Sequence, residues 1–185
     1  MTIRNTTLRW GVLAQVLHWT IVALIIVQVT LGSIAHDLPL GMEKLATLAR
    51  HKSVGITILM LAAIRLLWRW FNPTPPLPGT LKPYERFLAR FTHAALYVLL
   101  FALPLSGWIM SSARNFRVSW FNVFQLPDLV SPNRPLYDAM HETHEVLVWA
   151  LGAIAILHAG AALKHHFILK DDVLRRMLPF TRTRS

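Results

Sequence analysis

Residues 141–166 read HETHEVLVWALGAIAILHAGAALKHH, with five histidines inside or beside a long apolar run. Between Val146 and Leu163 the only ionisable side chain is that of His158. A bilayer core requires about 20 predominantly apolar residues per helix, so this stretch is long enough to cross a membrane. Because an ionisable side chain is costly inside such a span, its presence there indicates a functional site.

Three more apolar runs of similar length precede this one. Of the 185 residues, 54% are hydrophobic and only 15% are charged, which is typical of a membrane protein. The absence of cysteine excludes disulfides, zinc–thiolate sites and iron–sulfur clusters. We therefore expect an all-α integral membrane four-helix bundle in which residues 1–185 form one domain. The predicted spans are roughly residues 12–35, 51–71, 91–112 and 141–167.

The net charge of +10 favours an orientation in the membrane rather than binding to nucleic acid, because the basic residues lie mostly outside the apolar runs. Thirteen of the nineteen basic residues, Arg182 and Arg184 among them, fall on the side that holds both termini. Since basic residues accumulate on the cytoplasmic side, we predict that both termini are cytoplasmic and that the membrane is the bacterial inner membrane.

The fourth run places two histidines on one helix face. His144 and His158 are 14 positions apart, which at about 100° per residue returns to within about 40° of the same direction. The rise of about 1.5 Å per residue separates them by roughly 21 Å, so they lie at two depths of one bilayer. His141 falls on a different face and is the weaker candidate.

Each of these histidines has a partner at matching depth in another span. His18 lies near the cytoplasmic end of the first run and matches His158, whereas His51 opens the second run at the outer face and matches His144. Zinc or copper requires three or four protein ligands, but two axial imidazoles in an apolar sleeve suit a b-type haem. We therefore predict iron ligation by His18 and His158 at an inner haem and by His51 and His144 at an outer haem.

Several other residues have open roles. His93 opens the third run at the depth of the inner pair, where it is a candidate alternative ligand, haem propionate partner or quinone contact. Arg50 and Lys52 beside His51, and Arg65 for the inner site, are candidates for pairing with propionates or for reaching the membrane surface. The aromatic connection at about 113–139 is expected to lie against the membrane surface. Small residues expected to admit a flat macrocycle are Gly55, Gly107, Gly152 and Gly160.

Nearly the whole chain resembles the bacterial di-haem cytochrome b561 family of the inner membrane. The matching stretches begin with LHW at His18, HKSVGI at His51 and RLLWRWFNPTPP from Arg65. They continue with HAALYVLLFALPLSG from His93 and with HETHE leading to LHAGAALKHHF and KDDVLRRMLP, the block up to Pro179 being the most specific.

This resemblance implies two non-covalent haem b groups on the histidine pairs just given. It also implies electron transfer across the membrane by a quinone-linked oxidoreductase, with ubiquinone as acceptor and superoxide as a candidate donor at the periplasmic side. The alternative is a haem subunit that anchors a larger membrane dehydrogenase or hydrogenase and receives electrons from that redox partner. A third reading is a cofactor-free transporter or scaffold whose histidines relay protons.

Overall fold

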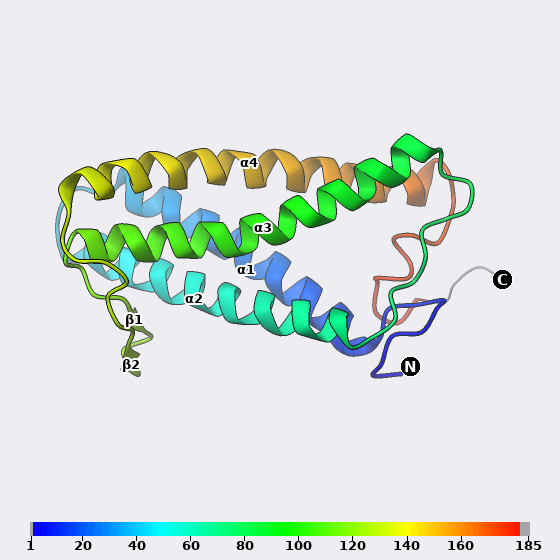
Figure 1. Cartoon of the computed structure of the whole chain (residues 1–185), viewed down its shortest axis with the longest axis horizontal. Coiled ribbons are helices and arrows are strands. Elements are labelled where there is room, and N and C mark those ends of the chain that lie inside the picture. The colour runs from blue at the N-terminus through cyan, green and yellow to red at the C-terminus, as the bar shows by residue number, and fades with distance from the viewer. Residues whose placement is uncertain (1, 182–185) are drawn as a thin grey trace. The chain divides into compact units, whose positions relative to one another are not determined.

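Four long helices make up most of the chain in the computed structural model, which describes residues 2–181 (Figure 1). They are α1 (Val12–Asp37), α2 (Met42–Trp70), α3 (Pro83–Ala113) and α4 (Arg134–Phe167), with a two-stranded hairpin, β1 (Ser119–Trp120) and β2 (Phe124–Gln125), between α3 and α4. All four helices are long and apolar enough to cross a membrane. The predicted all-α, four-span fold is confirmed, whereas Arg182 and Arg184 lie outside the described residues.

Three helices begin several residues before the predicted apolar runs, because polar first turns extend them. Proline, favoured at the first helical position, opens α3 at Pro83, and the Glu85 carboxylate accepts a hydrogen bond from the Lys82 N–H at 3.0 Å. Before α4, Asn133 Oδ1 accepts from the Leu136 N–H at 2.9 Å and caps the helix. Hydropathy registers only the apolar part of each helix and therefore places these starts too late.

The described residues fall into two compact units, each of which takes a segment from all four helices. The first unit contains the residues up to Thr20, Ala63–Val98 and those from Leu151 onward. The second unit contains Ile21–Ala62 and Leu99–Ala150, which includes the hairpin. Each predicted histidine pair falls within one of these units.

Large apolar side chains cover the outside of the helices, while small ones fill much of the inside. On α4, Val146, Trp149 and Ile156 are each at least 66% exposed. Such a face suits lipid contact in a helix that crosses a membrane. The most deeply buried side chains include Ala62 and Ser112, since small residues allow helices to approach closely.

In the first unit, the segment after α4 folds back onto the N-terminal residues. The Trp19 indole N–H donates to the Met177 carbonyl at 2.9 Å, and Arg9 Nη2 donates to the Leu178 carbonyl at 2.7 Å. These bonds satisfy carbonyls of a segment without helix or strand. They thereby fix the entry to α1, the helix that carries His18.

In the second unit, the hairpin is fastened to α2. Its turn has positive φ at Phe121 (46°) and Asn122 (60°), and Val123 N–H donates to the Trp120 carbonyl at 2.9 Å, as in a type I′ turn. Ser53 Oγ accepts from the Phe121 N–H at 3.0 Å. A second bond, from the Trp120 indole N–H to Thr57 Oγ1 at 3.0 Å, holds the strand beside the same helix.

Candidate haem sites

The histidine pair of the second unit joins α2 and α4. The ring centres of His51 and His144 are 6.3 Å apart, with an angle of 67° between the ring planes. His141 is exposed and instead lies 6.0 Å from the Tyr137 ring. The structure therefore brings His144, rather than His141, opposite His51.

The hydrogen bonds of this pair fix which ring nitrogen carries the proton. His51 Nδ1 lies 3.2 Å from the backbone carbonyl oxygen of Gln28. This oxygen can only accept a hydrogen bond, so Nδ1 is the donor. His144 Nδ1 lies 2.9 Å from Ser106 Oγ, whose own proton is donated to the Leu103 carbonyl at 2.9 Å, so this Nδ1 also donates. Both neutral rings therefore keep a lone pair on Nε2, the form in which imidazole binds a metal.

Gln28, Ser106 and Gly32 are parts of this site that the sequence did not single out. A Cβ on Gly32 would come within 3.3 Å of His51 Cε1, and a Cβ on Gly107 within 3.4 Å of the corresponding atom of His144. These two glycines therefore leave room for the rings. The available signal was a polar Gln28 inside an otherwise apolar run, but sequence alone does not give the direction in which it points.

The other expected glycines divide into two kinds. A Cβ on Gly55 would meet Gln28 Nε2 at 3.2 Å, so Gly55 makes space beside the second-unit pair. A Cβ on Gly152 or Gly160 would meet nothing within 4 Å. Gly55 and Gly107 thus lie against side chains of the protein, whereas Gly152 and Gly160 border open space.

The histidine pair of the first unit joins α1 and α4. The ring centres of His18 and His158 are also 6.3 Å apart, with an angle of 78° between the ring planes. His93 from α3 lies closer to His158, at 5.2 Å between ring centres. Three imidazoles therefore meet in this unit, with His158 the ring in contact with both others.

The two equal separations fit an iron held between axial imidazoles. Two metal–nitrogen bonds of about 2 Å, with a ring radius added at each end, place ring centres roughly 6 Å apart. The His93–His158 separation is too short for that arrangement, so His18 is the better partner of His158. Among the described residues, no cluster of three or more His, Asp or Glu side chains suits a metal ion.

The basic residues near the pairs are held in different ways. Lys52 lies against Phe116, with Nζ 5.6 Å from the ring centre, and Arg50 is exposed. In the first unit, Arg65 Nε donates to the Tyr97 hydroxyl at 3.2 Å. Arg65 is thus directed into its unit, whereas Lys52 is held by an aromatic ring of the hairpin connection.

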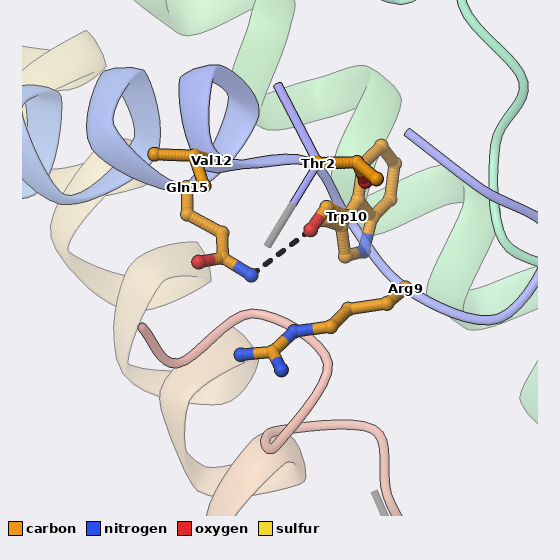
Figure 2. Close-up of a pocket in the computed structure, with 5 residues that line it drawn as sticks. All are labelled: Thr2, Arg9, Trp10, Val12 and Gln15. Atoms are coloured by element: carbon orange, nitrogen blue, oxygen red, sulfur yellow. Dashed lines mark hydrogen bonds between the residues drawn. The ribbon is translucent and has the colours of Figure 1, made fainter. Parts of the chain in front are cut away.

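A small pocket at the N-terminal segment is separate from these histidines. Figure 2 shows the Gln15 side chain reaching the Trp10 carbonyl, a hydrogen bond of 3.0 Å from Nε2. The pocket measures about 50 Å³, far below the roughly 300 Å³ at which ligand sites begin. It therefore suits water rather than a cofactor; its lining residues are Thr2, Arg9, Trp10, Val12 and Gln15.

Four apolar helices long enough to cross a membrane and two facing histidine pairs define a class of protein: a helical membrane protein with imidazoles paired inside its bundle. A family model described as "Prokaryotic cytochrome b561" matches residues 9–180. The chain belongs to this family, as its sequence motifs predicted. Membership makes it a bacterial membrane cytochrome of the b type that binds haem and transfers electrons.

Curated relatives agree with this assignment. The chain is 37% identical over 182 residues to "Cytochrome b561 homolog 2" of Escherichia coli (strain K12), covering 96% of this chain and 95% of the relative. It is 31% identical over 163 residues to "Probable superoxide oxidase CybB" of Yersinia pestis, covering 88% and 92%. It is 35% identical over 136 residues to "Cytochrome b561 homolog 1" of Escherichia coli (strain K12), covering 70% and 73%.

Proposed function

We propose that the chain is a single-domain di-haem cytochrome of the bacterial inner membrane that passes electrons across the bilayer to ubiquinone. The observation that carries the proposal is the equal 6.3 Å separation of the two histidine pairs, one in each unit. Each bound haem b supplies a one-electron carrier. Both pairs draw one histidine from α4, and these two histidines are 14 positions apart, so one continuous helix contributes to both sites.

The residues of the second-unit pair prepare the imidazoles before any metal arrives. The Gln28 carbonyl and Ser106 Oγ hold the two Nδ1 protons and thereby direct both Nε2 atoms toward the shared space. Gln28 Nε2 lies 3.1 Å from His51 Nε2, the nitrogen that would hold the iron, so this amide would have to turn away for His51 to act as a ligand. Its Oε1 is buried without a hydrogen-bond partner.

Superoxide is the proposed donor, at the side of the second unit. One relative carries the name of a probable superoxide oxidase. The basic and acidic residues of this unit sum to roughly zero, so any attraction of an anion is local: Arg117 lines an open hollow of about 410 Å³ together with Gln125, Pro127 and Asp128. With a histidine pair on each haem, no iron coordination position would be left for a donor, so the haem would supply electron transfer without binding the donor. The basic residue distribution supports cytoplasmic termini.

The first test is the haem content of the purified protein. Reduced-minus-oxidised spectra and pyridine–haemochrome quantitation are expected to give two haems b per wild-type chain and about one in each of His144→Ala and His158→Ala. A wild-type protein without haem would contradict the proposal and favour a histidine-bearing transporter or scaffold.

His141→Ala is the matched control, since it removes a neighbouring histidine on another face of α4. It is expected to retain both haems. If His144→Ala retained two haems and His141→Ala lost one, the ligand assignment at the second unit would be wrong. Stoichiometric co-purification of a soluble dehydrogenase subunit would favour the anchoring alternative over a stand-alone oxidoreductase.

A further inference from the structure

Two arginines lie inside the α2 span with no protein counter-charge. Arg65 and Arg69 are four positions apart and so occupy one face of the helix. Within residues 2–181, neither forms an ion pair with a carboxylate. A charge within a span is costly, so a partner of opposite charge is expected there. The ion pairs found are Arg134–Asp138, Lys164–Glu85 and His165–Asp171.

Arg65 is held across three helices rather than extended along the bundle toward the membrane surface. Its Nε donates to the Tyr97 hydroxyl of α3 at 3.2 Å, and its Nη1 lies 3.5 Å from the Ala14 carbonyl of α1. The Arg69 guanidinium carbon lies 5.7 Å from the centre of the Tyr97 ring. A guanidinium has five N–H donors, and these contacts use two, so most of the Arg65 fork is available to a ligand.

The contacts of Arg65 place it beside the first-unit histidines. Ala14 precedes His18 by one turn on α1, and Tyr97 follows His93 by one turn on α3. A b haem carries two propionate carboxylates at one edge of its ring. The planar fork of arginine matches a carboxylate with two parallel hydrogen bonds. Haem bound by His18 and His158 would thus bring the missing negative charge to Arg65.

We infer that Arg65, positioned by Tyr97, binds a propionate of the haem that His18 and His158 hold, with Arg69 adding positive charge. The inference rests on the proposed function, because it requires haem at this pair. Arg65 is a cofactor-binding residue and Tyr97 a positioning residue. Loss of a charge-assisted hydrogen bond to the propionate should release this haem roughly tenfold faster or more.

The experiment measures haem dissociation into excess apomyoglobin, in the full-length His144→Ala background that keeps the first-unit haem alone. Arg65→Gln is compared with the parent, each loaded with either iron protoporphyrin IX or its dimethyl ester, which has no carboxylate. We expect Arg65→Gln to accelerate release of the free-acid haem and to leave release of the ester unchanged. Arg65→Lys keeps the charge but not the planar fork of donors, so its release rate for the free-acid haem should lie between those of the parent and Arg65→Gln.

Arg86→Gln is the matched control, because Arg86 is an exposed arginine at the start of α3 that contacts the Gly79 carbonyl. Arg86→Gln should release the free-acid haem and the dimethyl ester at the parent's rates. The resonance Raman propionate bending band should shift in Arg65→Gln and Tyr97→Phe but not in Arg86→Gln. Equal acceleration for acid and ester haem, or none for either, would overturn the inference while leaving the proposed function intact. Wild type without haem would overturn both.

Discussion

At the scale of single residues, Ser106 shows how a hydroxyl with one proton determines which ring nitrogen of a histidine carries a proton. Because that proton goes to the Leu103 carbonyl, Ser106 Oγ can only accept from His144 Nδ1. A ligand that donates through its second nitrogen becomes more basic toward its metal. A stronger donor stabilises the oxidised iron more than the reduced iron, so Ser106 should lower the midpoint potential at this site.

Ser106→Ala is therefore expected to raise the midpoint potential of one of the two haems and to weaken its binding, by about 10- to 100-fold in affinity. A redox titration monitored by optical absorption measures the midpoint potentials of both haems in one sample. Ser112→Ala is the control on the same helix, since Ser112 bonds the Trp108 carbonyl and the Leu129 N–H instead of a histidine. Equal shifts in both variants would indicate a general loosening of α3.

At the scale of elements, the hairpin between α3 and α4 presents apolar side chains outward while its backbone is fastened to α2. Phe121 is 51% exposed and Val123 is 71% exposed. The anchoring bonds reach Ser53 and Thr57, which lie well inside α2 rather than at its first turn. From this depth we expect the turn to lie at the membrane interface.

We expect a nitroxide on Val123→Cys, introduced into the naturally cysteine-free chain, to be more accessible to oxygen than to a water-soluble nickel chelate in nanodiscs. Power-saturation electron paramagnetic resonance gives the two accessibilities. Labels at Ile156→Cys on the lipid face of α4 and at Thr80→Cys in the α2–α3 connection provide the apolar and aqueous references. A Val123 label that matched the Thr80 reference would place the hairpin in water.

The elements also show what the sequence could predict and what it could not. Four apolar runs gave the four helices because hydropathy is a local property. The hairpin was not predicted, since its turn uses Phe121 and Asn122 at positive φ, where glycine is the usual signal. The helix starts at Pro83 and Arg134 were missed because they depend on caps in polar sequence.

The candidate sites likewise contain features that the sequence could predict and features that it could not. Depth and helical phase along α4 were enough to pair His158 with His18 and His144 with His51, and the structure brings these rings together. Their role as iron ligands remains a prediction. Gln28 and Ser106 depend on the rotation of α1 and α3 about their own axes, which no periodicity in a uniformly apolar span reveals.

At the scale of the whole molecule, the two units differ in how firmly their histidines are held. Hydrogen bonds to Gln28 and Ser106 fix the rings of the second unit, whereas no hydrogen bond to the ring nitrogens of His18 or His158 is found within residues 2–181. The second-unit pair is therefore already ordered for a cofactor, whereas the first-unit pair loses more freedom when one binds. A ligand that binds only the folded state raises stability by an amount that grows with the logarithm of its concentration divided by its dissociation constant.

Removal of haem is thus expected to lower the thermal unfolding midpoint, and loss of the second-unit haem should lower it more than loss of the other. Circular dichroism melts of wild type, His144→Ala and His158→Ala in one detergent measure this order, with haem content determined on the same samples. His141→Ala should melt with the wild type. A His144→Ala midpoint above that of His158→Ala would contradict the expected order.

The placement of one histidine from each pair on α4 has a consequence for biosynthesis. This helix is the last of the four to leave the ribosome, so neither pair exists while only α1, α2 and α3 have been inserted. If these pairs hold haem as proposed, a nascent chain would not retain haem at a half-built bundle and accumulate as a reactive, partly assembled species. Haem loading would then be a late event that reports completed membrane insertion, and a cell could use it to distinguish finished chains from those due for proteolysis.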